Sequence, residues 1–115
     1  MKPVVYRNEE GVRFSPWSPV SAPIGMPMSQ TRTARDWHLM EEGVAMGIWE
    51  CTPGIWRRQV VKREFSYILA GHCIFTPDGQ PPIELRAGDS VYFPANCHGV
   101  WDVREDLRKS YLIIN

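Results

Sequence analysis

The hydrophobic pattern of this chain changes at residue 43. From Gly43 onward, short runs rich in Val, Ile, Tyr, Phe and Trp are separated by Gly, Pro, Asp and Asn. Such runs between turn-forming residues are typical of β-strands. They predict about eight strands, at Val44–Cys51, Ile55–Lys62, Phe65–Ala70, His72–Thr76, Ile83–Leu85, Ser90–Phe93, Gly99–Val103 and Arg108–Ile114. Many short strands with frequent turns favour a sandwich or a barrel, so we expect an all-β fold.

Two segments between these runs carry strong turn signals. Pro77-Asp78-Gly79-Gln80 combines a proline, which presets one backbone dihedral, with a glycine, which supplies a positive φ. We expect this segment to close a β-hairpin. Ala87-Gly88-Asp89 predicts a second turn.

The first 42 residues hold five prolines and show little periodicity. Because proline confines strands to sheet margins, this segment predicts an extended arm with one or two short edge strands. The apolar spacing within Thr31–Met40 is compatible with a single helical turn. We therefore expect an N-terminal arm, 1–42, whose edge strands pack on a barrel formed by residues 43–115.

The side chains of residues 64–70 indicate the oligomeric state through their alternation between the two faces of a strand. Successive side chains of a strand point to opposite faces. One face carries Glu64, Ser66, Ile68 and Ala70, and the other carries Phe65, Tyr67 and Leu69. Both faces are partly apolar, whereas a closed sheet needs only one apolar face inside. The other must be covered by the arm or by another subunit, so we predict a homodimer.

Composition narrows the classes of partner. The 115 residues fit one domain, and 13 basic and 13 acidic side chains give a formal net charge of zero. A neutral chain offers no electrostatic attraction to phosphate backbones or anionic lipid, so we expect no nucleic acid and no membrane as partner. No apolar stretch approaches the roughly 20 residues of a membrane span, and no secretory signal is evident, so we expect a cytoplasmic location.

The cysteines and the common nucleophile motifs add little chemistry. Cys51, Cys73 and Cys97 lie 22 and 24 positions apart, unlike the close pairs that bind zinc. We expect them to be buried small hydrophobes. Ser/His/Asp, Cys/His and phosphate-loop arrangements show no recognisable spacing.

Two stretches resemble the signature of the cupin family. The first family stretch runs glycine, five residues, His, one residue, His, three or four residues, Glu, six residues and glycine, and Glu64 with Gly71 matches its end. The second runs glycine, five residues, proline, one residue, glycine, two residues and His, and Gly88 with Pro94 matches its start. The resemblance implies a single-domain jelly-roll β-barrel, or double-stranded β-helix, with an extended N-terminal arm.

Most metal ligands of that signature are replaced. Counting back from Glu64, the two histidine positions hold either Arg58 with Val60 or Arg57 with Gln59. The third histidine position falls on Gly99, and Asn96 replaces the preceding glycine. Because a catalytic first-row metal usually takes three or more protein ligands, we expect no metal cofactor. The alternative is manganese or zinc held by Glu64, Gln59 and His98, which requires departures from regular strand geometry.

Within the cupins, the chain is similar to the cupin domains of ureidoglycine aminohydrolase and of the ethanolamine-utilisation cupin protein. The positions that carry this likeness are Trp49, Gly54, Trp56, Glu64, Gly71, Gly88-Asp89, Phe93-Pro94, Gly99, Trp101 and Arg108-Lys109-Ser110-Tyr111. Ureidoglycine aminohydrolase is a two-cupin enzyme that uses manganese bound by His, Glu and Gln. This chain has one cupin and one matching ligand.

Glu64 is the leading candidate for chemistry, because the resemblance places its carboxylate inside the barrel. A buried carboxylate needs a counter-charge, a hydrogen bond or a cation. By strand parity Arg58 and Lys62 share its face, while Lys109 and Tyr111 share one face of the last strand. We take Glu64, Lys109 and Tyr111 as catalytic candidates and Arg58 as a ligand-binding candidate. An ion pair that only fixes barrel geometry is the structural alternative.

Three further residues complete the ligand-binding candidates. Trp101 shares strand parity with Gly99 and is expected to wall the cavity, as a core aromatic or as a stacking surface for a planar or sugar-like ligand. Gln59 and His98 are the others. His98 faces the pocket only if a bulge around Asn96-Cys97 turns it inward.

The other two histidines are expected outside the site. His38 lies in the arm and is predicted to be a surface residue. His72 follows Gly71 at a strand start and is predicted at a rim.

Three functions are compatible with these residues. The first is a barrel that binds a small polar metabolite without a metal, with acid/base work by Glu64 aided by Lys109 or Tyr111. The second is a metal-dependent enzyme related to ureidoglycine aminohydrolase. The third is a non-catalytic sensor or structural subunit. These residues are compatible with an enzyme and with a protein that only binds its ligand.

Overall fold

The computed structural model describes residues 2–5, 7–8 and 11–115. Over these residues the regular structure consists of strands and one short 3₁₀ helix, η1 (Met40–Glu42), which confirms the all-β expectation. The strands are β1 (Ser18–Pro19), β2 (Pro23–Ile24), β3 (Gln30–Leu39), β4 (Val44–Cys51), β5 (Gly54–Val60), β6 (Arg63–Pro77), β7 (Ile83–Arg86), β8 (Ser90–Phe93) and β9 (Cys97–Ile114).

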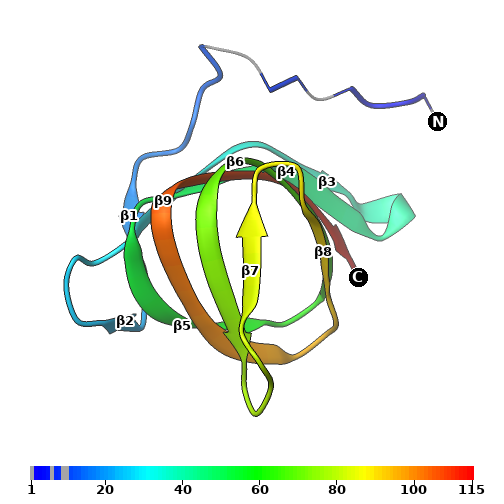
Figure 1. Cartoon of the computed structure of the whole chain (residues 1–115). Coiled ribbons are helices and arrows are strands. Elements are labelled where there is room, and N and C mark those ends of the chain that lie inside the picture. Colours follow the sequence, from blue (N-terminus) through cyan, green and yellow to red (C-terminus); the bar gives the residue numbers. More distant parts are fainter. Residues whose placement is uncertain (1, 6, 9–10) are drawn as a thin grey trace.

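The strands form one antiparallel sheet that curls into a barrel (Figure 1). Its frame is the pair β6 and β9, which run antiparallel to each other along most of their lengths. The first part of β9 also pairs with β5, and its second part pairs with β4. In the same way, β6 pairs first with β8 and then with β7. Each long strand therefore belongs to both halves of the barrel.

The sequence pattern divides each of these long strands into two, and that division is wrong. The predicted strands Phe65–Ala70 and His72–Thr76 are parts of β6, which bends where its register with β9 shifts between Ile68 and Cys73. Gly71 makes the bend feasible, because its φ is +97° and a Cβ there would lie 2.2 Å from the carbonyl oxygen of Asp106. In a sequence, a glycine usually indicates the end of a strand. Gly71 instead allows β6 to bend and continue as one strand.

Both predicted turns are confirmed. The amide of Gln80 donates to the carbonyl of Pro77, and the segment closes the β6–β7 hairpin. The amide of Asp89 donates to the carbonyl of Arg86, whose own amide donates to the Asp89 carboxylate.

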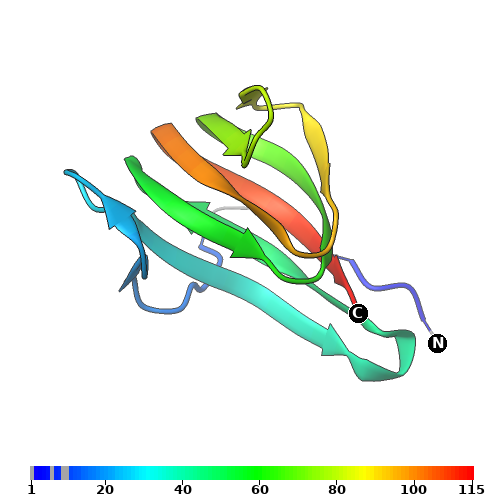
Figure 2. The same cartoon turned by 90° about the horizontal axis from the view of Figure 1, so that it is seen from below.

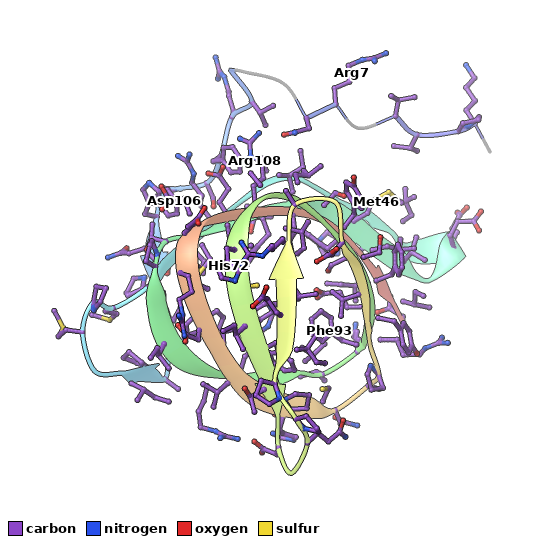
Figure 3. All side chains as sticks on the ribbon, in the orientation of Figure 1. Arg7, Met46, His72, Phe93, Asp106 and Arg108 are labelled. Carbon is purple, nitrogen blue, oxygen red and sulfur yellow. The ribbon has the colours of Figure 1, made fainter. Side chains whose placement is uncertain are left out.

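Side chains that point inward from alternate strand positions form the core. Aromatic rings dominate it, with Phe75 in edge contact with Phe93 and tilted against Trp101. Figure 3 shows Phe93, from β8, inside the ring of strands. Cys51 and Cys73 are buried as expected, while Cys97 is only partly buried. Burial raises the pKa of the Cys73 thiol to about 12, so this cysteine stays protonated at neutral pH.

The helical turn expected within Thr31–Met40 is wrong. Residues 30–39 form strand β3, which pairs with β4 in a hairpin whose connection contains η1. In Figure 2, β3 is the long cyan strand along the lower side of the molecule. The two short edge strands are present, since β1 pairs with β3 and β2 pairs with β5. A division of the chain into an arm, 1–42, and a barrel, 43–115, stays a prediction.

A cluster of charged and aromatic side chains holds the segment before β1 against the sheet. The Glu50 carboxylate accepts from the guanidinium groups of Arg32, at 2.7 Å, and Arg108, at 2.8 Å. The Phe14 ring lies against both guanidinium groups, with its centroid 4.3 Å from Cζ of Arg32 and 5.2 Å from Cζ of Arg108. The Trp17 ring also covers Arg32. We call these five residues the arm clamp.

Candidate ligand-binding site

A cavity of about 260 Å³ opens at one end of the barrel beside Glu64. Five strands form its walls, because at least one lining residue comes from each of β3, β4, β5, β6 and β9. The lining residues are His38, Ala45, Trp49, Arg58, Glu64, Lys109, Tyr111 and Ile113. Four sequence-predicted site residues therefore meet here: Arg58, Glu64, Lys109 and Tyr111.

The centre of this site is a buried ion pair. Lys109 Nζ donates to Glu64 Oε2 at 2.6 Å, and the Ser66 hydroxyl donates to the same oxygen at 2.8 Å. Glu64 is 2% exposed and Lys109 is 1% exposed. The pairing joins β6 to β9, which are neighbours in the sheet. The counter-charge that the sequence required for Glu64 is thus Lys109, not Lys62, which is exposed.

The surroundings decide the protonation state of the Glu64 carboxyl. Burial acts to raise the pKa of Glu64, but the charges of Lys109 and Arg58, with the hydrogen bonds from Lys109 and Ser66, outweigh burial and lower it. Glu64 is therefore ionised at neutral pH.

The surroundings have the opposite effect on the Lys109 ammonium. Burial first, and the charge of Arg58 second, lower the pKa of Lys109 to about 8, although Glu64 acts to raise it. The ammonium also lies near the rings of Trp49, Trp101 and Phe93, with Nζ 4.8, 5.5 and 5.6 Å from the centroids. A neutral amine is therefore accessible slightly above neutral pH.

Arg58 is the second cation of the site. Its Nη2 lies 3.5 Å from Glu64 Oε1, a distance at the limit for a hydrogen bond. Its Nη1 is buried, and no residue in the described part of the chain accepts a hydrogen bond from it. The rings of Trp49 and Trp56 lie near its guanidinium, with Cζ 5.4 and 6.0 Å from their centroids. Arg58 thus keeps a donor that is unused.

Trp101 lies behind the cavity and not on its wall. It is fully buried and packs against Phe75, Phe93 and Trp49. Trp49, which is partly buried, occupies the wall position that the sequence analysis expected for Trp101. The indole of Trp101 therefore supports Trp49 and Lys109 from the core side.

The metal alternative requires Gln59 and His98 beside Glu64, and the structure does not bring these three side chains together. Gln59 and His98 are register partners on β5 and β9, and both are exposed. The bulge proposed to turn His98 inward is not seen, although Asn96 does adopt a positive φ of 57° at the position of the family glycine. Gln59 and Glu64 both line a smaller cavity of about 190 Å³, but His98 is not among the residues that line it.

Among residues 2–5, 7–8 and 11–115, no group of three or more His, Cys, Asp or Glu side chains could hold a metal ion.

The position of the third family histidine is occupied by other atoms. A Cβ on Gly99 would lie 2.5 Å from Cζ of the Phe75 ring and 2.6 Å from the carbonyl oxygen of Thr76. Phe75 has thus filled the space that a histidine side chain would need. A single substitution at residue 99 does not recreate the family ligand.

Besides the aliphatic Ala45 and Ile113, two residues that line the site, His38 and Trp49, were not among the sequence-predicted candidates. His38 is exposed, as expected, yet it lies at the cavity because β3 pairs with β4 and places it opposite Ala45. Trp49 was noted only as part of the family likeness. The alternating Thr residues at 31 and 33 were a signal for the strand that carries His38, but the register that positions it depends on the β3–β4 pairing.

His72 is partly buried on β6, and its Nε2 lies 3.7 Å from the Glu84 carboxylate. It is not among the residues that line the cavity beside Glu64.

An antiparallel barrel framed by two long bent strands, with a cavity at one end, is the architecture of the cupins. A family model for EutQ-like cupin domains matches residues 40–111. The chain belongs to this family, which confirms the cupin resemblance.

Solved structures agree with this fold. The EutQ protein of Clostridium difficile is 18% identical, with a TM-score of 0.65, over 82% of this chain and 76% of that chain. A DUF861-family protein of unknown function from Pseudomonas syringae is 19% identical, with a TM-score of 0.79, over 91% of this chain and 46% of that chain. A DUF861-family protein from Thermotoga maritima is 31% identical, with a TM-score of 0.54, over 56% and 73% of the two chains.

These likenesses are evidence for the fold and leave the reaction unassigned. No curated protein matches the chain. Within the described residues there is no helix of the length and apolarity needed to cross a membrane.

Proposed function

We propose that this chain binds a small organic anion in the cavity beside Glu64 and Lys109, without a bound metal. The observation that carries the proposal is Arg58, which lines that cavity and whose buried Nη1 has no acceptor in the described part of the chain. A buried donor without a partner costs free energy. A ligand carboxylate is the acceptor that best matches a guanidinium.

Charge and size support the same class of ligand. Arg58 and Lys109 face the single carboxylate of Glu64, so the inner part of the cavity carries an excess positive charge when both are protonated. The volume of about 260 Å³ lies below the range of about 300–1,000 Å³ that is typical of drug-sized ligands. The ligand is therefore a metabolite with few heavy atoms.

The pair gives the site the means to move a proton. Glu64 is ionised, and Lys109 releases its proton slightly above neutral pH. A homodimeric state and a cytoplasmic location belong to this proposal as well. A sensor subunit would use the same cavity and differ only in lacking turnover.

The metal-dependent alternative has less support. Glu64 already accepts from Lys109 and Ser66 on one oxygen and lies near Arg58 on the other. The two side chains that would have to join it, Gln59 and His98, are exposed.

Binding of small anions is tested by thermal shift and calorimetry, because a ligand of the native state raises apparent stability. Small mono- and dicarboxylates are compared with their neutral amides. Arg58→Gln is expected to remove the shift. Arg57→Gln is the matched control, since Arg57 is the next residue, is exposed and pairs with Asp78 outside the cavity.

Two results overturn this proposal. The first is the absence of any carboxylate that stabilises the protein, or equal binding by the Arg58→Gln variant. The second, which concerns the metal-free part, is a stoichiometric amount of manganese or zinc in the purified protein by elemental analysis.

A further inference from the structure

The ligand class of this cavity can be narrowed further, on the assumption that the proposed anion site is correct. We propose that Lys109 forms an imine with the carbonyl carbon of a 2-oxo acid whose carboxylate is held by Arg58.

The first support is the position of the amine. Lys109 lines the cavity, and its Nζ lies in a water-poor setting next to the rings of Trp49, Trp101 and Phe93. The chain has two other lysines, Lys2 and Lys62, and both are exposed. A desolvated amine is a better nucleophile than one on the surface, because its charged form is disfavoured. The lowered pKa of Lys109, about 8, agrees with this geometry.

The second support is a proton carrier in contact with that amine. Glu64 Oε2 accepts a hydrogen bond from Lys109 Nζ at 2.6 Å. Imine formation needs a group that takes a proton from the attacking amine and returns one to the departing oxygen. Glu64 is placed to do both, and Ser66 holds its carboxylate in position.

The third support sets the spacing within the ligand. Arg58 and Lys109 contact the two oxygens of one carboxylate, with Nη2 near Oε1 and Nζ near Oε2 of Glu64. The two cationic groups are therefore close neighbours. A ligand with its carboxylate and its carbonyl on adjacent carbon atoms can use both groups at once, and that arrangement is found in a 2-oxo acid.

The reaction balances without an added oxidant or reductant. Glu64 first takes the ammonium proton of Lys109. The neutral amine then attacks the carbonyl carbon, so a C–N bond forms while the carbonyl π bond breaks, and its oxygen takes that proton from Glu64 and becomes a hydroxyl. Glu64 accepts a proton from nitrogen and delivers it to that hydroxyl, which leaves as water. In total, the lysine ammonium and the 2-oxo acid give a protonated imine and one molecule of water.

The experiment uses the full chain with pyruvate as probe and sodium cyanoborohydride as the trapping reagent. Intact mass and peptide mapping are expected to show one reduced adduct, located on Lys109, and its formation is expected to accelerate as pH rises through about 8. Lactate, which keeps the carboxylate but lacks the carbonyl, is expected to slow trapping by competition. Arg58→Gln should lower the trapping rate at least tenfold, whereas Lys62→Gln should leave it unchanged.

The controls separate this inference from the anion site on which it rests. If pyruvate and lactate both stabilise the protein but Lys109 is not labelled, or is labelled no faster than Lys2 and Lys62, the imine is refuted and the anion site stands. If neither compound nor any other small carboxylate stabilises the protein, the proposed function itself fails. Lys109→Gln serves as the negative control only if its melting temperature shows that it is folded. If Lys109→Gln is not folded, the imine is tested by comparing the trapping rate of the parent protein with that of Arg58→Gln, which keeps the amine.

Discussion

At the scale of single residues, the Glu64–Lys109 pair is the main polar feature of the interior, and neither side chain can be changed alone without a cost in stability. Neither charge reaches water, so each depends on the other. Replacing Lys109 by Met keeps much of its volume but leaves Glu64 without its closest counter-charge. We expect a loss of about 3–5 kcal/mol in the free energy of unfolding, measured by urea denaturation.

The double variant is the control for this prediction. Glu64→Gln combined with Lys109→Met removes both charges and should recover most of the loss, because a buried pair often contributes little net stability. A single variant that is as stable as the parent protein would show that the pair is hydrated in solution.

The ionisation of Glu64 makes stability depend on pH on the acid side. The folded-state pKa of Glu64 is lowered from 4.5, so its ionised form is favoured by folding. Its contribution to stability is complete above the unfolded pKa and is lost as the pH falls through the folded pKa. Urea unfolding from neutral to acid pH should show this loss in the parent protein. The loss should be smaller in Glu64→Gln, and identical pH profiles would contradict the prediction.

Gly99 provides a residue-scale test of why the family metal site is missing. In Gly99→His the new side chain meets the Phe75 ring, so we expect destabilisation of at least about 1–3 kcal/mol from overpacking, without a gain in manganese or zinc binding. Arg104→His, on an exposed position of the same strand, is the control and should be near neutral. Stoichiometric metal in Gly99→His would mean that Phe75 gives way.

Strand parity explains which site residues could be predicted from the sequence. Arg58, Glu64 and Lys109 lie on regular strands, where successive side chains point to opposite faces. Their inward direction therefore follows from the sequence, without knowledge of the partner strands. His38 and Trp49 were missed as site residues because parity gives a face but not the neighbours on that face. Their places in the cavity depend on which strands pair, and that is set by the whole sheet.

At the scale of elements, the long bent strands show where local patterns mislead. Residues 104–106 are charged and exposed, so the pattern ends one strand at Val103 and begins another at Arg108. The structure runs β9 through this segment, because its neighbour β6 bends with it at Gly71. Hydrophobic periodicity detects which residues are buried. It does not detect that a single strand continues from one half of the barrel into the other through an exposed segment.

The arm clamp makes a prediction about the N-terminal segment. Glu50 accepts from both Arg32 and Arg108, so Glu50→Gln weakens two contacts at once. We expect amide hydrogen exchange in residues 12–20 to become roughly fivefold faster, equivalent to about 1 kcal/mol, with little change in the barrel strands. Asp102→Asn removes an exposed pair with Arg104 elsewhere and should leave the arm unchanged. Faster exchange throughout the barrel would indicate a general loss of stability instead.

At the scale of the whole molecule, the outer face of the sheet is more apolar than an isolated domain requires. Phe65 and Tyr67 of β6 are 46% and 42% exposed, and Tyr92, the register partner of Phe65 on β8, is 54% exposed. A hollow of about 420 Å³ lies on this face, and among the described residues Asn8, near the N-terminus, lines it together with residues of the sheet. Met46, also on its wall, and Arg108 lie on the outer side of the barrel in Figure 3.

A second copy of the chain is the partner that the sequence analysis predicted for this face, and the structure gives the residues with which to test it. We expect a dimer at micromolar concentration by light scattering coupled to size exclusion, because association would remove Phe65, Tyr67 and Tyr92 from water together. Tyr67→Lys places a charge at the centre of the face and should give monomers that unfold at lower urea concentration. Ile24→Lys changes an equally exposed apolar residue on β2, away from this face, and should stay dimeric. A monomeric parent protein, or equal dissociation by both variants, would mean that this face is not a subunit interface.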